Sequence, residues 1–160
     1  MNPTKVLILM GSKSDAPVVE KAEAVLREFG VPFVTLVRSA HRTPEATVRA
    51  VKEAEEAGCE VFICAAGMAA HLAGVVCSKT VRPVIGLPVA AGSLNGQDAL
   101  YSTVMMPPGL PVATVGINAG RNAGLLAVQV LATHDEALRE KLLADRRAQA
   151  AAILGEASGD

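Results

Sequence analysis

The residues best suited to chemistry lie in one short segment, Ser39-Ala40-His41-Arg42. It combines a hydroxyl, an imidazole and a guanidinium directly before Thr43-Pro44, a pair typical of a helix start. A serine and an arginine at a helix N-terminus can bind a phosphate dianion together. An imidazole can give or take a proton near neutral pH. The segment therefore predicts a phosphate site with an acid/base group, although a lone histidine is more often structural.

A second polar segment, Gly11-Ser12-Lys13-Ser14-Asp15, also precedes a predicted helix. Its glycine, hydroxyls and free backbone N–H groups suit a phosphate, whereas the carboxylate of Asp15 suits a ribose hydroxyl. The segment has the spacing of neither the Walker motif nor the dinucleotide-binding GxGxxG motif. The open alternative is a polar turn without a ligand, in which Ser14 or Asp15 caps the helix.

A third segment, residues 67–74, consists almost entirely of small side chains, with His71 as its one polar member. Small residues allow a ligand to approach the backbone closely. The alternative is a helix that opens within this stretch and packs tightly on the sheet, with His71 hydrogen-bonded internally. The remaining histidine, His134, precedes the last helix and is interpreted as structural or surface-exposed.

Five apolar runs must position these segments, and they predict strands at residues 6–10, 33–37, 61–65, 83–86 and 111–115. Helical patterns separate the runs, and two more follow the fifth run, at residues 121–131 and about 135–154. The first of these two is apolar nearly all round, which is typical of a helix in a core or an interface. The alternation predicts right-handed βαβ units and a mostly parallel five-stranded sheet in one α/β domain.

The order of the elements also locates the ligand. In an open parallel sheet, ligands bind beyond the carboxyl ends of the strands. Four loops occupy that position: residues 11–15, 39–43, 66–74 and 88–96. The first three hold the residues singled out above, so the sequence predicts a scaffold that presents them to one small, phosphate-bearing molecule.

Composition argues against several classes of function. A net charge of −1 and an aromatic content of 2% are atypical of nucleic-acid-binding proteins. No apolar run approaches the roughly 18 residues of a membrane span. The mean hydropathy of +0.35 is high for a soluble monomer, so we expect a homo-oligomer. The first residues lack the features of a signal peptide, which favours a cytoplasmic location. The cysteines form no CxxC pair and are expected to be reduced and packed.

The motifs resemble those of the PurE family of purine biosynthesis. The resemblance runs in order from about residue 5 to residue 131, and the first two motifs at this spacing are highly specific. The segments that carry it are Gly11-Ser12-Lys13-Ser14-Asp15, Ser39-Ala40-His41-Arg42-Thr43-Pro44, Ala69-Ala70-His71-Leu72, Met106-Pro107-Pro108-Gly109 and Pro111-Val112-Ala113-Thr114. His71 in its His-Leu loop resembles the bacterial branch, the N5-carboxyaminoimidazole ribonucleotide mutases. The animal-type branch has Arg-Ser-Asn in that loop and carboxylates aminoimidazole ribonucleotide directly with CO2.

The resemblance implies a flavodoxin-like three-layer fold for a single catalytic domain, residues 1–160. It also implies a homo-octamer with the C-terminal helix at a subunit interface, no metal and no organic cofactor. The substrates would be a ribonucleotide and CO2. The resemblance also implies a functional link to an ATP-dependent N5-carboxyaminoimidazole ribonucleotide synthetase. By position, His41 would be the general acid/base. The implied substrate-binding residues are Ser12, Ser14, Asp15, Ser39, Ala40, Arg42, Gly67, Ala70, His71 and Leu72.

Three positions depart from the family pattern. Met68 stands where a glycine is common, Ala73 stands where a proline usually follows His-Leu, and Met105 stands where a glutamine is usual. None of these changes removes a proton-transfer group. The changes do bear on the shape of the pocket and on the choice between the two branches. Two alternatives to a mutase remain open: a direct carboxylase, and a non-catalytic module of the same fold that binds a phosphate-bearing ligand.

Overall fold

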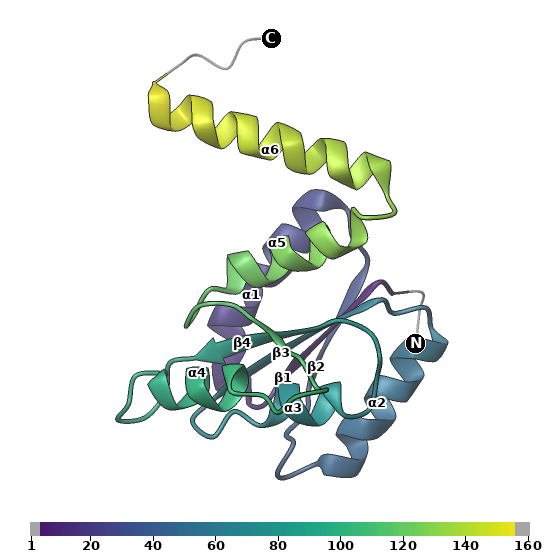
Figure 1. The fold of residues 1–160 in the computed structure, drawn as a ribbon, viewed down its shortest axis with the longest axis vertical. Helices are drawn as coiled ribbons and strands as arrows, with labels where there is room; N and C mark the ends of the chain where they lie inside the picture. Colours follow the sequence, from purple (N-terminus) through teal and green to yellow (C-terminus); the bar gives the residue numbers. More distant parts are fainter. Residues whose placement is uncertain (1–3, 156–160) are drawn as a thin grey trace.

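The computed structural model describes residues 4–155, and a five-stranded parallel sheet forms its centre (Figure 1). The strand order is β2-β1-β3-β4-β5, the flavodoxin-like order in which successive strands are added on one side of β1 and then on the other, while all strands stay parallel. In the register, Val6 of β1 pairs with Phe33 of β2 and with Val61 of β3. The strands are β1 (Val6–Met10), β2 (Phe33–Val37), β3 (Val61–Gly67), β4 (Val84–Val89) and β5 (Ala113–Thr114).

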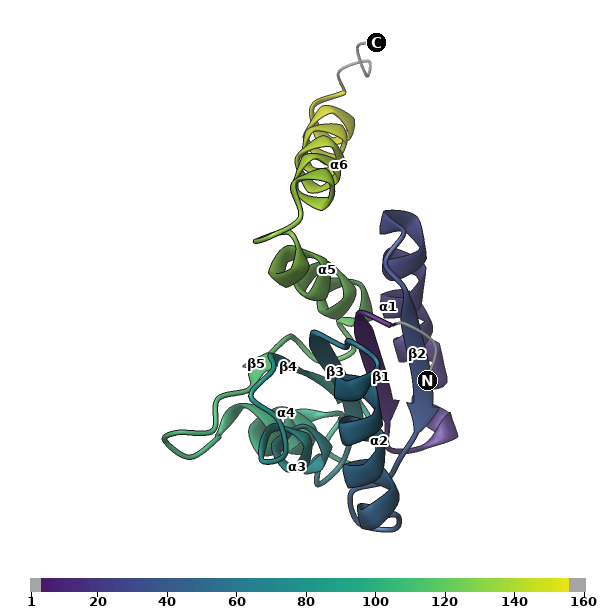
Figure 2. The same cartoon turned by 90° about the vertical axis from the view of Figure 1, so that its right-hand side faces the viewer.

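Helices cover both faces of the sheet, which gives the three layers predicted from the sequence (Figures 1 and 2). Helices α1 and α5 lie on one face, and α2, α3 and α4 lie on the other. The helices are α1 (Ala16–Phe29), α2 (Pro44–Glu56), α3 (Leu72–Cys77), α4 (Gln97–Val104), α5 (Gly120–Leu131) and α6 (Glu136–Leu154), with a short 3-10 helix η1 (Lys13–Asp15) before α1.

The core is aliphatic and divided by the sheet. Alternate side chains of a strand point to opposite faces, so Val6 and Ile8 pack under α1 and α5, whereas Leu7 and Leu9 pack under α2 and α3. All four are fully buried. Burial on both faces explains why β1 is a continuous apolar run and not an alternating one.

Helix α5 packs closely on α1 through two glycines. A Cβ at Gly124 would lie 2.8 Å from the carbonyl oxygen of Ala22, and a Cβ at Gly120 would collide with the carbonyl oxygen of Val18. The apolar residues of α5 are thus explained by the core, because the buried side of the helix faces α1 and the sheet.

Helix α6 leaves the domain and projects away from the sheet (Figures 1 and 2). Asp135 caps it, accepting a hydrogen bond from the backbone N–H of Leu138 at 3.0 Å. Leu138 and Leu142 are buried against the domain, whereas Leu143 is exposed. Within residues 4–155, no helix is long and apolar enough to cross a membrane.

Several predicted boundaries were wrong. Strand β4 continues through Pro88 to Val89, so the predicted loop at 88–96 starts later. Pro88 is tolerated because its neighbour β5 has already ended at Thr114, and no ladder partner needs the missing N–H. That edge strand has two residues where five were predicted. Strand β3 ends at Gly67 where residue 65 was predicted, and α3 starts at Leu72, inside the small-residue segment 67–74 where a helix start was expected.

The contact between α1 and α5 gives a stability prediction. Alanine normally stabilises a helix interior relative to glycine by about 1 kcal/mol, but Gly124→Ala would press a methyl group onto Ala22 and Val25. We expect a net loss of about 1–3 kcal/mol in the free energy of unfolding, measured with urea. Gly74→Ala is the matched control, since its nearest neighbour is the flexible end of Met106, at 3.4 Å. A Gly124→Ala variant as stable as the wild type would contradict this packing.

Candidate active site

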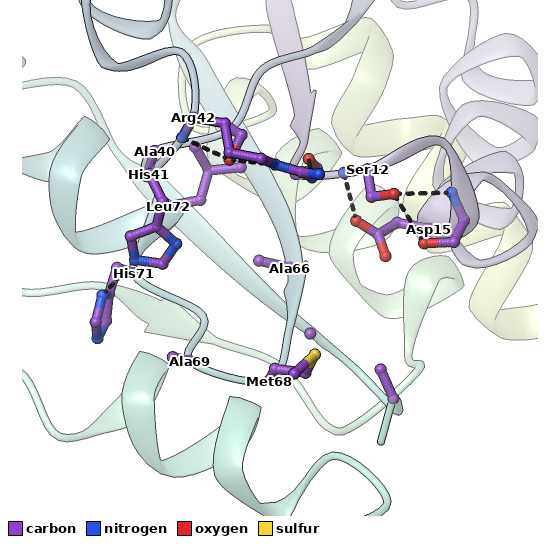
Figure 3. Close-up of a pocket in the computed structure, with 15 residues that line it drawn as sticks. Ser12, Asp15, Ala40, His41, Arg42, Ala66, Met68, Ala69, His71 and Leu72 are labelled. Carbon is purple, nitrogen blue, oxygen red and sulfur yellow. Dashed lines mark hydrogen bonds between the residues drawn. The ribbon is translucent and has the colours of Figure 1, made fainter.

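A pocket of about 490 Å³ opens at the carboxyl edge of the sheet (Figure 3). It lies where the loops after β1, β2, β3 and β4 meet, which is the position predicted from strand order. Its walls are Gly11, Ser12, Ser14, Asp15, Ser39, Ala40, His41, Arg42, Ala66, Gly67, Met68, Ala69, His71, Leu72 and Ala91.

The loop after β1 is held by a capping box around η1. The backbone N–H of Ser12 donates to Asp15 Oδ2 at 3.0 Å, and the Ser12 hydroxyl accepts from the backbone N–H of Ser14 at 3.3 Å. Ser12 therefore caps the 3-10 helix η1, whereas Asp15, one of the two predicted caps, occupies the N-cap position of α1 without a side-chain cap bond to it. Burial raises the pKa of Asp15 above its ordinary value of 3.8, although the hydrogen bond from Ser12 opposes the shift.

The loop after β2 is closed on itself by hydroxyl groups. Thr43 is the N-cap by position, but its Oγ1 accepts from the backbone N–H of Ser39 at 2.9 Å and makes no cap bond to α2. The Ser39 hydroxyl in turn accepts from the backbone N–H of Arg42 at 3.1 Å. Arg42 Nη2 donates to the carbonyl oxygen of Gly11 at 3.3 Å, which ties this loop to the loop after β1.

Two histidines from different loops form a hydrogen-bonded pair. His41 Nε2 lies 2.7 Å from His71 Nδ1, and the rings meet edge to face with centroids 4.9 Å apart. One nitrogen must carry the hydrogen while the other accepts it. A proton can therefore pass between the two imidazoles. His71 is thus hydrogen-bonded to a residue of the pocket wall, and not to an internal group as in the alternative of a tightly packed helix.

The opposite wall of the pocket is apolar and built from small residues. A Cβ at Gly67 would lie only 2.9 Å from Ala91 Cβ, so this glycine lets the loops after β3 and β4 touch. Met68 follows with φ 56°, a left-handed conformation that is unusual for a residue with a side chain. Ala70, predicted to bind substrate, is 2% exposed in the core and is not on the pocket wall.

The pocket gathers the other ten predicted site residues: Ser12, Ser14, Asp15, Ser39, Ala40, His41, Arg42, Gly67, His71 and Leu72. Sequence reasoning missed five lining residues: Gly11, Ala66, Met68, Ala69 and Ala91. The sequence did contain a signal for these residues, because each lies at or just beyond the carboxyl end of a buried strand. All five lie within the predicted site loops 11–15, 66–74 and 88–96, but they carry no charged or hydrogen-bonding side chain that would single them out from their neighbours.

Other reactive groups lie outside this site. The three cysteines are buried and free, and burial raises the pKa of the Cys59 thiol to about 11. His134 contacts Glu60 at 2.7 Å, at the opposite end of the sheet, which agrees with the structural interpretation. Among residues 4–155, no group of three or more His, Cys, Asp or Glu side chains is arranged to hold a metal ion.

The fold and the pocket define the class: an α/β protein with a small-molecule pocket at the switch point of its sheet. Within that class, the chain belongs to the AIR carboxylase family, whose model matches residues 5–152. This confirms the resemblance to the PurE family.

Named relatives support the assignment. The N5-carboxyaminoimidazole ribonucleotide mutase of Methanocaldococcus jannaschii is 54% identical over 138 residues, 86% of this chain and 85% of that protein. The enzyme of the same name from Escherichia coli K12 is 46% identical over 155 residues, 96% and 92% of the two chains. The crystal structure of Treponema denticola PurE superposes with a TM-score of 0.87 at 31% identity, covering 95% of each chain.

The burial of Asp15 gives a pH-dependent prediction. Its raised pKa means that the native state binds the proton more tightly than the unfolded chain does. The stability that this proton contributes is present at low pH and is lost as pH rises through the raised pKa. We therefore expect Asp15→Asn to unfold at higher urea than the wild type at about pH 7, with the difference shrinking toward acid pH.

Asp135→Asn is the matched control for this experiment. Asp135 also accepts a backbone hydrogen bond at a helix start but is exposed, so no such gain is expected. An Asp15→Asn variant that is less stable than the wild type at about pH 7, with the deficit shrinking toward acid pH, would contradict the prediction and show that the charged carboxylate stabilises the loop.

Proposed function

We propose that this protein is an N5-carboxyaminoimidazole ribonucleotide mutase of purine biosynthesis, which moves a carboxylate from an exocyclic nitrogen to C4 of the imidazole. The observation that carries the proposal is the pair of imidazoles 2.7 Å apart on the wall of the pocket. It supplies a proton carrier beside a small apolar chamber, and the relatives at 46–54% identity carry this name.

In this proposal, the polar side of the pocket binds the ribonucleotide. Arg42 and the hydroxyl of Ser39 hold the phosphate at the start of α2, and Ser12 and Ser14 add hydroxyl donors from the neighbouring loop. The carboxylate of Asp15 accepts from the ribose. These contacts are remote from the reacting atoms, so their binding energy can orient the imidazole.

The reaction then runs by loss and recapture of CO2. The bond between the exocyclic nitrogen and the carboxylate breaks, CO2 leaves, and that nitrogen takes a proton from His41. The electron-rich C4 attacks the CO2 carbon to form the new C–C bond. A base removes the C4 proton, which restores the aromatic ring. His41 serves in both steps, and His71 holds its ring and exchanges the proton with it.

Confinement is the other requirement. Holding CO2 beside C4 makes its recapture an intramolecular step. Small and apolar groups, among them Gly67, Ala69 and Leu72, form the wall near the histidines without offering CO2 a competing partner. Ala40 completes the chamber, and Ala70 supports it from the core beneath.

The proposal extends to assembly and setting. We infer that the chain works as one catalytic domain in a homo-oligomer, an octamer, located in the cytoplasm. The projecting α6 supports an interface role, because Leu143, Ile153 and Leu154 are exposed on it. An ATP-dependent synthetase would supply the N5-carboxylated substrate. The protein needs no metal or organic cofactor for the steps above.

A second candidate is direct carboxylation of aminoimidazole ribonucleotide by CO2, which the family description names. The two are separated by incubating the protein with N5-carboxyaminoimidazole ribonucleotide, or with aminoimidazole ribonucleotide plus bicarbonate, at low total CO2. We expect C4-carboxylated product only from the first. Product only from the second would make the chain a direct carboxylase. Activity on neither, with ribonucleotide binding retained, would leave a binding module.

The role of His41 is tested by His41→Asn. We expect turnover to fall by about 100-fold or more, because a positioned acid/base contributes roughly 10²–10⁴ in rate, while product binding measured by calorimetry persists. His134→Asn, at the far end of the sheet, is the control and should keep wild-type turnover. If His41→Asn retains a tenth of the wild-type kcat, another group carries the proton.

The role of Arg42 is tested by Arg42→Ala. We expect the Kd of the product to rise about 10- to 100-fold, in line with the loss of a charge-assisted contact to phosphate. Arg38→Ala is the matched control, because Arg38 lies in the same loop but is not part of the pocket wall. An unchanged Kd in Arg42→Ala would remove the phosphate role.

A further inference from the structure

Met68 is the one sulfur on the wall of the pocket. It follows β3 directly, lines the pocket (Figure 3) and is 59% exposed. Its backbone is held at φ 56°, a conformation that glycine adopts without cost but that strains a residue with a side chain. A long apolar side chain is thus exposed to solvent at a position where the backbone conformation favours glycine.

The position of Met68 makes it part of the apolar chamber. A Cβ at Gly92 would lie 3.8 Å from Met68 Cγ, so this side chain reaches across to the loop after β4. Among the lining residues, the other apolar side chains are alanines and Leu72, which is 2% exposed. Met68 is therefore the longest apolar side chain of the wall, and it is exposed.

Oxidation of the other sulfur-containing side chains that the structure describes is less able to affect this pocket. The thiolate is the reactive form of cysteine, and burial raises the pKa of Cys59 to about 11 and also raises those of Cys64 and Cys77. Met10 and Met106 are only partly exposed, and neither lines the pocket. Met105 is 77% exposed but also lies outside the pocket wall, which makes it an internal reference.

We propose that Met68 is a peroxide-sensitive modification site whose oxidation reversibly lowers turnover in this pocket. The thioether sulfur attacks one oxygen of hydrogen peroxide, the O–O bond breaks, and Met68 becomes a sulfoxide while water leaves. Sulfur is oxidised by two electrons and peroxide is reduced by two. Methionine sulfoxide reductases reverse the change.

The physical effect follows from the place of the new oxygen. A sulfoxide is polar, accepts hydrogen bonds and holds water. Next to the alanine, glycine and leucine residues of the pocket wall, the sulfoxide is a polar group in an otherwise apolar surface. The water that it retains competes with CO2 for the space in the pocket. Filling the pocket would bury the oxygen without a partner, so we expect about a tenfold loss of kcat/KM at full oxidation of Met68.

The test compares the wild type with Met68→Leu and Met105→Leu, each treated with hydrogen peroxide. Activity is expressed relative to the untreated value of the same variant, and peptide mass spectrometry gives the oxidation of each methionine. We expect the wild type and Met105→Leu to lose activity in step with oxygen added at residue 68, and Met68→Leu to keep its activity. Methionine sulfoxide reductase should restore the loss, and a thiol reductant alone should not.

Two results would overturn the proposal: an equal loss of activity in Met68→Leu, or full oxidation of Met68 without loss. Because the inference rests on the proposed function, product affinity is measured as a second readout. An untreated protein without mutase activity would count against the proposed function alone, and weaker product binding after oxidation of Met68 would still support the modification site. Unchanged product binding in such a protein would count against both.

Discussion

The parallel pairing of β1 with β2 on one side and β3 on the other is the constraint on which the site depends. It brings the ends of four strands to one edge, so that segments far apart in sequence meet at a switch point. Burial of β1 from Val6 to Leu9 fixes this arrangement, since its alternate side chains serve both cores. Two contacts then close the pocket across the loops: Arg42 to the carbonyl of Gly11, and His41 to His71.

The pocket divides its work by strand. The loops after β1 and β2 supply serines, an arginine, a carboxylate and His41, whereas the end of β3 and the loops after β3 and β4 supply mainly small or apolar residues together with His71. This arrangement suits a ligand with an anionic end and a reacting end that must be kept away from water. Local cost accompanies the function: Asp15 is buried although burial disfavours its charge, and Met68 holds a left-handed backbone.

Much of this could be predicted from the sequence. Strands β1 and β2 have the predicted bounds, because apolar runs between turn residues are local signals. The three polar segments were found because glycine, serine and histidine at strand ends are also local. The boundary of β4 was wrong because a proline near a strand end reads as a loop unless the length of the neighbouring strand is known.

Other features depend on the third dimension and leave no trace in a single chain. His41 and His71 are 30 residues apart, and the registers of β2 and β3 on either side of β1 bring their rings together. Ala70 and Ala69 are chemically identical neighbours, yet one is buried in the core and the other lines the pocket. The cap at Ser12 depends on a 3-10 turn, which differs from an α-helical start by one hydrogen bond.

A crystal structure of the protein with the C4-carboxylated ribonucleotide would test the central claim most directly. The account predicts the phosphate within hydrogen-bond distance of Ser39 Oγ and the Arg42 guanidinium, and the new carboxylate beside His41, facing the small apolar wall. A ligand bound in the reverse direction, with its phosphate at the two histidines, would contradict the assignment of both ends of the pocket. Binding elsewhere on the molecule would contradict the site itself.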